Sequence, residues 1–241
     1  ARKSIELEFF IYNVDEAARL VTQALMKKAR EGVQVRILVD FSTPVFELKP
    51  AYARLLGEAG VKVRYYNTSA TYRLVSIQHR SHRKLLIIDE ATVLTGGRNI
   101  ANDYFDLSDH YNFLDSDLEV TGPIVKAVLQ SFDVYWNSRL ATAPALHSEP
   151  NDEAARFVVP QAGDVALLDR LRAAGESYRQ PHQAHPCQDL RFATDFPNQG
   201  EKSRNVFNAI VDELRRAKQE AVVESPYFVI KSGGYAVLED L

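Results

Sequence analysis

Apolar residues at the start of the chain occur in blocks whose spacing alternates between that of strands and that of helices. Residues 4–12 (SIELEFFIY) are rich in β-branched and aromatic side chains and predict a buried strand. Residues 15–30 carry apolar side chains at helical spacing. A strand over 33–40, a helix over 49–59 and a strand over 61–67 complete a β-α-β-α-β order. This order predicts an α/β fold with a mixed, largely parallel central sheet and helices on both faces.

The pattern of the rest of the chain is less regular. Proline, alanine and polar residues dominate 139–200, which predicts a long connection with only short periodic pieces. Around this connection the pattern predicts a hairpin over 83–90 and 92–95, a strand over 117–121, a helix over 123–137, a helix over 204–218, a strand over 221–229 and the start of a helix over 234–241.

A short internal similarity suggests a repeat. Residues 8–11 (EFFI) correspond to 226–229 (PYFV), since each segment follows an apolar strand and precedes a helix. We therefore expect a first repeat over 1–138, an inter-repeat connection over 139–200, and the beginning of a second, truncated repeat over 201–241.

Composition narrows the class of protein. The chain has 241 residues, 46% of them hydrophobic, and a formal net charge of -3, so no overall basic field is available for non-specific nucleic-acid binding. Cys187 is the single cysteine, which excludes an intrachain disulfide and favours a reducing compartment. The sequence has no apolar run of bilayer-spanning length. It begins at Ala1, so we expect a trimmed chain.

One segment combines the residue types that phosphoryl chemistry needs. Residues 83–90 are expected to form a strand, so His82 and Lys84 should point the same way. A neutral imidazole is a competent nucleophile near pH 7, and an ammonium beside it can hold a phosphoryl oxygen. Paired glycines let the backbone approach a ligand, and an asparagine adds an amide donor. The full pattern is His82-x-Lys84-x4-Asp89-x6-Gly96-Gly97-x-Asn99, which favours a phosphodiesterase half-site over a surface strand ended by a glycine turn.

This pattern resembles the HKD signature of the phospholipase D superfamily, and its flanks resemble bacterial cardiolipin synthases of the C type. The similar flanking segments are 97–100 (GRNI), 103–105 (DYF), 113–117 (FLDSD), 122–123 (GP), 132–138 (FDVYWNS) and 225–228 (SPYF). The resemblance implies a phospholipase D-like fold in which two such motifs meet at a pseudo-twofold interface.

The resemblance also implies a mechanism without metal or cofactor. One histidine attacks phosphorus and forms a phosphohistidine, while the other protonates the leaving alcohol and then activates the incoming alcohol or water. His82 is the candidate nucleophile, although the sequence does not reveal which histidine attacks first. Asp89 belongs to the catalytic motif and is expected to support the local structure. Lys84, Gly96, Gly97 and Asn99 would bind phosphate. Asp117, or failing that Asp115, should accept a hydrogen bond from the other imidazole nitrogen.

The implied substrate is a phospholipid such as phosphatidylglycerol, and the implied location is peripheral, on the cytoplasmic face of the bacterial inner membrane. No nucleic-acid partner is expected. The second HKD half would come from a missing C-terminal part or from a dimer mate, because these residues contain no other His-x-Lys. The alternatives are a phospholipase D hydrolase, a single-motif nuclease active as a homodimer, and an inactive, cytoplasmic half-domain fragment.

Two departures from the resemblance bear on lipid preference. Ser81 and Ser116 stand where related sequences often have apolar residues.

Other candidate residues have a structural explanation as well as a functional one. The spacing of His182, His185 and Cys187 resembles that of metal ligands, but a solvated loop is favoured because no fourth ligand is evident. Five cationic or histidine residues near the motif suggest a funnel for anionic substrate or a solvated charged loop: Arg73, His79, Arg80, Arg83 and Arg98. Four aromatic residues could face acyl chains or pack in the core: Tyr104, Phe105, Tyr111 and Phe113.

Overall fold

The computed structural model describes residues 1–41, 48–68, 80–144, 149–179, 184–197 and 204–223. These residues fall into two compact units, 1–190 and 191–241. The first unit contains the whole HKD motif and is built around one sheet, whereas the described part of the second consists of one helix and its flanking segments.

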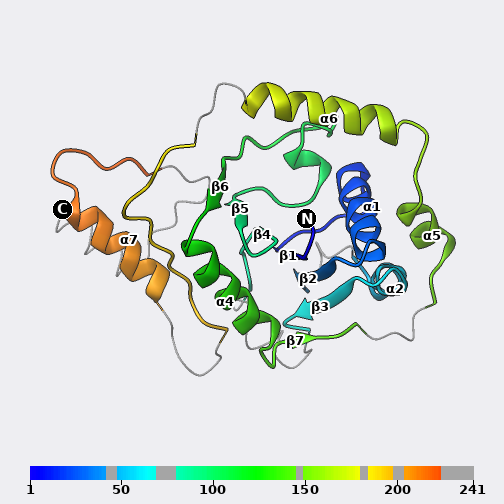
Figure 1. Ribbon diagram of the computed structural model, residues 1–241, viewed down its shortest axis with the longest axis horizontal. Coiled ribbons are helices and arrows are strands. Elements are labelled where there is room, and N and C mark those ends of the chain that lie inside the picture. Colours follow the sequence, from blue (N-terminus) through cyan, green and yellow to red (C-terminus); the bar gives the residue numbers. More distant parts are fainter. Residues whose placement is uncertain (42–47, 69–79, 145–148, 180–183, 198–203, 224–241) are drawn as a thin grey trace. The chain divides into compact units, whose positions relative to one another are not determined.

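A seven-stranded sheet organises the first unit, with the strand order β6-β5-β4-β1-β2-β3-β7 (Figure 1). β1, β2 and β3 pair in parallel, and the other neighbours pair antiparallel, including the β4–β5 hairpin. The strands are β1 (Ser4–Phe9), β2 (Gln34–Asp40), β3 (Lys62–Tyr66), β4 (Leu85–Ile88), β5 (Thr92–Gly96), β6 (Asp117–Thr121) and β7 (Ala141–Thr142). The expected mixed α/β sheet with helices on both faces is confirmed, and its parallel part is the centre formed by β1, β2 and β3.

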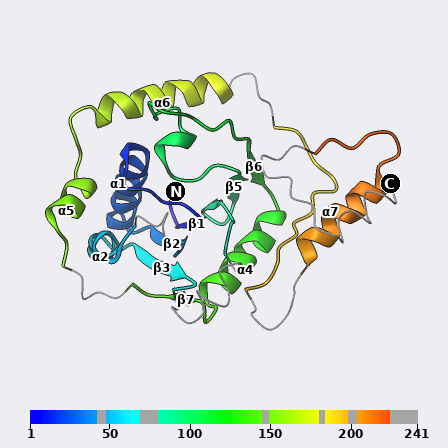
Figure 2. The same cartoon turned by 180° about the vertical axis from the view of Figure 1, so that it is seen from behind.

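Helices cover the two faces of the sheet. Helix α1 (Glu16–Arg30) and helix α2 (Pro50–Glu58) connect the parallel strands and lie on one face, whereas helix α4 (Ile124–Trp136) lies on the other (Figures 1 and 2). Asp15 caps the first of these helices by accepting from the backbone N–H of Ala18 at 3.0 Å.

Side-chain alternation along the central strands makes the two faces chemically different. The face under α1 and α2 is apolar and forms the core, with Ile5, Leu7, Phe9, Val35, Ile37, Val39, Val63 and Tyr65 all buried. On the opposite face β1 carries the buried carboxylates Glu6 and Glu8. Arg36 from β2 pairs there with Glu6 at 3.2 Å and with Asp133 of α4 at 2.7 Å. The polar chemistry of this protein is thus concentrated on the face covered by α4.

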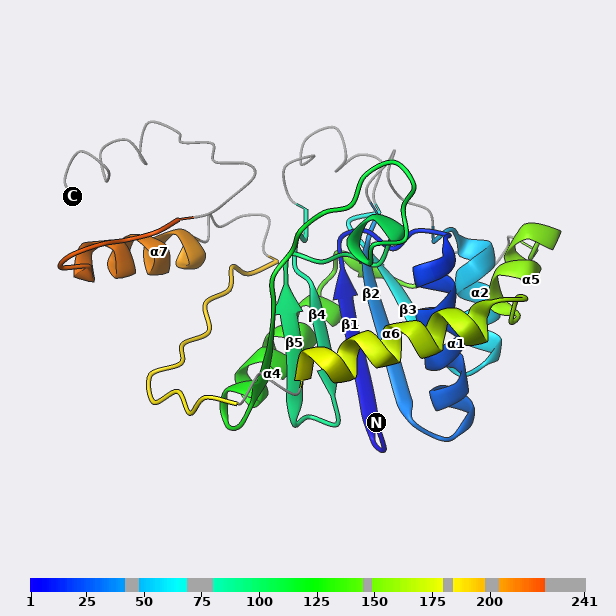
Figure 3. The same ribbon diagram turned by 90° about the horizontal axis from the view of Figure 1, so that it is seen from above.

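The segment 139–200 differs from its sequence prediction. It contains β7, helix α5 (Asp152–Val158) and helix α6 (Asp164–Arg179), which is longer than the short periodic pieces expected. Both helices contact α1, and Figure 3 shows α6 running across that side of the sheet. The Arg19 guanidinium binds the Asp164 carboxylate at 2.7 Å, which ties α6 to α1. Much of this segment therefore belongs to the first unit.

The second unit contains helix α7 (Asn205–Arg216), which matches the helix predicted over 204–218. Residues 221–223 form no strand, and the remainder of the predicted second-repeat strand and helix, 224–241, lies outside the described residues. Among the helices of the described ranges, none combines the length and the apolar character that a membrane crossing requires.

Candidate active site

The HKD residues lie where β1 ends and β4 begins. β4 runs antiparallel to β1 and pairs Leu85 with Glu8, so the residues just before Leu85 lie beside the carboxyl end of β1. β4 is shorter than the strand predicted over 83–90, so Lys84 as well as His82 lies before it, in a segment without regular secondary structure. The carboxyl ends of parallel strands are the usual place for ligand binding in open α/β sheets.

His82 and Lys84 nevertheless contact each other directly. The Lys84 ammonium lies 2.9 Å from Nδ1 of His82 and 2.9 Å from the His82 carbonyl oxygen. Phe10 packs against the imidazole, with ring centroids 4.5 Å apart, and its ring also lies 5.7 Å from Lys84 Nζ. Lys84 is buried while His82 is exposed. The ammonium and one ring nitrogen thus form a compact pair supported by an aromatic face.

Burial and the neighbouring charges tune both groups. Although His82 is exposed as a whole, partial desolvation of its ring lowers its pKa, and the nearby Lys84 cation lowers it further. Burial lowers the pKa of Lys84 to about 8, and the Asp115 carboxylate opposes that change. Near pH 7 the imidazole is therefore mainly neutral and the lysine mainly charged, which is the combination of nucleophile and oxyanion donor that attack on phosphorus requires.

Asn99 lies on the other side of the segment that follows β1. Its Oδ1 accepts from the backbone N–H of Ile11 at 3.1 Å, and its Nδ2 donates to the Tyr104 hydroxyl at 2.8 Å. Because Phe10 contacts His82 and the adjacent Ile11 binds Asn99, the two predicted site residues flank the same short segment. An amide nitrogen has two donors, so one N–H of Asn99 remains for a ligand.

Gly96 and Gly97 pack tightly against the segment that leads into β6. A methyl group on Gly96 would overlap the Ser116 carbonyl and lie 2.7 Å from the Asp117 Cα, and one on Gly97 would overlap the Asp115 carboxylate. In this structure, space for the 115–117 backbone and side chains therefore explains both glycines, and their contact with phosphate stays a prediction.

The carboxylate chosen to orient His82 has another partner. Asp117 Oδ2 accepts from Arg98 Nε at 2.6 Å, and Arg98 also donates to the Asp115 carbonyl oxygen at 3.2 Å. Among the described contacts of Asp117, none reaches the His82 ring, whose Nδ1 faces Lys84 instead. Asp117 lies on the edge strand β6, where the partly buried Arg98 guanidinium binds it, and the role expected for Asp117 or Asp115 in orienting His82 stays a prediction.

Asp89, the aspartate of the HKD motif, follows β4, whereas His82 and Lys84 precede it. Its carboxylate accepts hydrogen bonds from the backbone N–H groups of Arg2, Lys3 and Ser4, at 2.6 to 3.1 Å. These bonds lower its pKa to about 2. Four strand residues at about 3.3 Å each separate it from Lys84, so Asp89 is too far away to act on substrate there. In this structure it anchors the start of β1, as expected for a residue that supports the local structure, and its assignment to the catalytic group stays a prediction.

Several contacts that build the site were not found from the sequence, namely those of Phe10, Tyr104, Glu8, Asp40 and Ser81. For Glu8 the sequence did contain a signal. Glu6 and Glu8 occupy alternate positions of an otherwise apolar strand, and alternate positions of a strand lie on one face of the sheet.

The aromatic loop beyond Asn99 is largely solvent-exposed. Tyr104 stacks on Phe113 at 4.8 Å, and Tyr111 meets Phe113 edge-on at 5.2 Å. Phe113 is 40% exposed and Tyr111 is 58% exposed, so these two residues are not core residues. Phe105 instead lies under Arg98, whose guanidinium is 5.4 Å from the ring centre.

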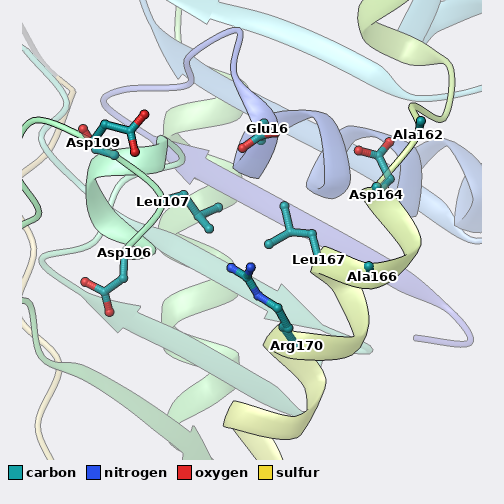
Figure 4. Close-up of a pocket in the computed structure, with 11 residues that line it drawn as sticks. Glu16, Asp106, Leu107, Asp109, Ala162, Asp164, Ala166, Leu167 and Arg170 are labelled. Atoms are coloured by element: carbon teal, nitrogen blue, oxygen red, sulfur yellow. The ribbon is translucent and has the colours of Figure 1, made fainter.

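A cavity of about 480 Å³ lies between this loop and the first turns of α6. Figure 4 shows Leu107, Leu167 and Arg170 pointing into it, with Asp106 and Asp109 at its rim. The residues lining it include no member of the HKD motif. The cavity is therefore separate from the candidate active site.

Of the three residues whose spacing resembles that of metal ligands, two lie in the part of the chain that the structure describes. His185 and Cys187 lie in an exposed segment, and His182 falls outside the described residues. Within the described ranges no group of three or more His, Cys, Asp or Glu side chains could hold a metal ion. Of the five residues proposed as an anion funnel, Arg73 and His79 also fall outside these ranges.

Comparison with known proteins places this geometry in context. The model of the family described as "Cardiolipin synthase, PLD-like domain" matches residues 1–136, which include the complete HKD motif. The major cardiolipin synthase ClsA of Bacillus subtilis (strain 168) is 34% identical over 139 residues, covering 57% of this chain and 29% of that protein. Cardiolipin synthase A of Pseudomonas fluorescens is 25% identical over 243 residues, covering 99% of this chain and 43% of that protein.

Among solved structures, phosphatidylserine synthase from Haemophilus influenzae Rd KW20 is similar with a TM-score of 0.49 and 17% identity, covering 75% of this chain and 39% of that chain. This chain thus spans less than half of the length of each of these three proteins.

Proposed function

Because this chain belongs to the family of cardiolipin synthase, PLD-like domains, we propose that it is one half of a phosphatidyltransferase that exchanges the headgroup alcohol of a phospholipid. The observation that carries the proposal is the pairing of a neutral imidazole with a buried ammonium, His82 with Lys84, on the aromatic face of Phe10. This pair supplies a nucleophile and a positive donor at one point, which is what transfer of a phosphoryl group needs.

The first chemical step uses Nε2 of His82, once substrate has drawn Lys84 away from Nδ1 and the ring proton has moved to Nδ1. The lone pair on Nε2 of His82 attacks phosphorus, the bond between phosphorus and the leaving oxygen breaks, and a phosphohistidine forms. A histidine from the second half gives a proton to the leaving oxygen, so that the headgroup alcohol departs neutral. Lys84, the remaining N–H of Asn99 and the Gly97 region hold the charged phosphoryl oxygens.

The second step reverses the roles. The second histidine takes the proton of an incoming alcohol, the oxygen of that alcohol attacks phosphorus, and the bond between phosphorus and Nε2 of His82 breaks. With two molecules of phosphatidylglycerol the products are a dimeric phospholipid and glycerol, whereas water in place of the alcohol would give phosphatidic acid. The chain supplies one HKD motif, so a C-terminal half or a dimer mate must supply the other.

The proposed substrate class also implies where the enzyme works. A phospholipid headgroup is reached at the membrane surface, so we place the enzyme peripherally on the cytoplasmic face of the bacterial inner membrane. No metal or cofactor takes part in the proposed steps, because the nucleophile, the proton carrier and the oxyanion donors are all side chains.

The test is a headgroup-transfer assay on the full-length gene product in mixed micelles. Radiolabelled phosphatidylglycerol should yield a labelled dimeric phospholipid, and the activity should be lost in His82→Asn. Formation of phosphatidic acid alone would replace the transferase with a hydrolase. Cleavage of plasmid DNA by the 241-residue chain, lost in His82→Asn, would replace both with a dimeric nuclease.

A further inference from the structure

The backbone on either side of His82 is held by side chains, because the segment before β4 has no strand pairing of its own. Ser81, the residue before the histidine, makes two hydrogen bonds. Its backbone N–H donates to Asp40 Oδ2 at 2.8 Å, and its hydroxyl donates to Glu8 Oε1 at 2.6 Å. Ser81 is 4% exposed, and Glu8 and Asp40 are each 1% exposed. Two almost fully buried carboxylates therefore converge on one serine.

These carboxylates come from neighbouring strands of the rigid sheet. Glu8 of β1 is in register with Leu38 of β2, and Asp40 is two residues farther along β2, so both acids lie on the same face at the carboxyl ends of their strands. Both acids come from the central, paired strands of the sheet, and both bind the segment that carries His82. A site held by strand residues is more precisely placed than one held by a loop.

Each carboxylate also has a cation from the same segment. Arg80 donates to Asp40 at 3.2 Å, and Arg83 lies 3.5 Å from Glu8 with its guanidinium 4.2 Å from the ring centre of Tyr135 in α4. Burying a charged group is costly unless it is paired, so a fold gains little stability from two acids and two arginines in place of apolar residues. The cluster is better explained by what it positions.

Burial raises the pKa of both acids, and the paired arginines oppose that change. The Ser81 N–H further opposes it for Asp40, and the Ser81 hydroxyl does so for Glu8. The serine thus stabilises the charged form of each acid, and each acid in turn fixes the serine.

We infer that Glu8 and Asp40 are positioning residues for His82, which clamp Ser81 and thereby hold the imidazole against Phe10 and Lys84. The catalytic use of this ring position rests on the proposed function. The clamp itself is a statement about the position of the ring and not about turnover. Ser81 is the link, because it binds both carboxylates and directly precedes His82 in the chain.

The test is an NMR spectrum of the histidine rings of the 241-residue chain, with the His82 signal identified by its loss in His82→Asn. Ser81→Ala removes the hydroxyl that binds Glu8 and adds no volume. We expect the His82 signals of this variant to shift and broaden. Its titration midpoint should rise, because the ring leaves the desolvated position and the cation that lower its pKa.

Two variants serve as controls. Ser81→Thr keeps the hydroxyl and should preserve the His82 signals. Ser131→Ala changes another buried serine, in α4, whose hydroxyl has no hydrogen-bond partner in the described structure, and it should also preserve them. The inference is overturned if Ser81→Ala leaves the His82 shifts and midpoint unchanged, or if Ser131→Ala moves them as much.

Thermal unfolding of each variant shows whether it is folded. If Ser81→Ala does not fold, Glu8→Met tests the same clamp, because it removes the acceptor of the Ser81 hydroxyl with a side chain of similar length. Displaced His82 signals support the clamp, and preserved signals overturn it. These spectra do not measure turnover. A negative result would therefore refute the clamp and not the proposed function, and an inactive enzyme would refute the proposed function and not the clamp.

Discussion

The ammonium of Lys84 lies 2.9 Å from Nδ1 of His82, so the two basic groups of the HKD motif contact each other directly. An ammonium can only donate, which makes Nδ1 the acceptor and leaves the ring proton of the neutral imidazole on Nε2. The attack through Nε2 that we propose needs the opposite tautomer. On that proposal Lys84 exchanges the imidazole for a phosphoryl oxygen when substrate binds, which lets the proton move to Nδ1.

This relationship predicts the tautomer of His82 in the chain without ligand. Nitrogen-15 spectra at pH 7, where the imidazole is neutral and Lys84 is still mainly charged, should show Nε2 protonated and Nδ1 as the acceptor. Lys84→Met should abolish that preference and raise the His82 pKa by removing a neighbouring cation. Lys126→Met, which alters an exposed lysine of α4, should leave both unchanged. Protonated Nδ1 in the parent chain would contradict the assigned hydrogen bond.

Lys84 should also reduce the stability of the fold. The pKa of Lys84 in the folded state, about 8, lies below its unfolded value of about 10.4. Holding the charged form therefore lowers the free energy of unfolding. This cost is fully present below pH 8 and is relieved as the pH rises toward about 10.4. Lys84→Met should therefore raise the free energy of unfolding at pH 7 by on the order of 2 kcal/mol. Urea titrations at pH 7 and pH 10 test this, and a variant less stable than the parent at pH 7 would refute it.

Asp89 should have the opposite pH dependence. Its folded pKa of about 2 lies below the unfolded value of about 3.9, so its stabilising effect is complete above pH 4 and is lost as pH falls through 2. Asp89→Asn should lower the unfolding temperature at pH 6 and matter much less at pH 2. Glu90→Gln, at the exposed neighbouring residue, is the control and should change little. Equal losses for Asp89→Asn at both pH values would exclude a role for its charge.

The paired glycines give a packing prediction. Gly96→Ala should destabilise the chain by about 2 kcal/mol, because its methyl group meets the Ser116 and Asp117 backbone, which cannot move aside as a flexible side chain would. Gly57→Ala is the matched control, since nothing lies within 4 Å of its added methyl group and the residue is inside α2. That control should be neutral or stabilising by up to about 1 kcal/mol. Equal effects of the two substitutions in thermal unfolding would contradict the close packing.

The sequence predicted the elements with strong periodicity. The three parallel strands, the hairpin, α1 and α4 agree to within a few residues, because their apolar spacing reflects the burial that the fold imposes. α6 was missed because its charged, weakly amphipathic sequence binds the core through the Arg19–Asp164 ion pair rather than through an apolar stripe. Such a tertiary contact has no local signature.

The contacts around the predicted site residues could not be found from the sequence. The motif spacing identified His82 and Lys84, yet their mutual hydrogen bond and the diversion of Asp117 to Arg98 depend on how separate strands meet. The carboxylates that hold Ser81 come from β1 and β2, more than forty residues upstream in the sequence, and only the odd placement of charged residues in buried strands hinted at them.

The central claim is that His82 carries the phosphatidyl group during headgroup transfer. The direct measurement is a rapid-quench experiment on the full-length gene product with phosphatidylglycerol labelled at phosphorus, followed by peptide mapping. We predict acid-labile label on the peptide containing His82, and a loss of transfer of at least about a thousandfold in His82→Asn. Full transfer activity in His82→Asn, or label on the chain that never maps to His82, would contradict the account.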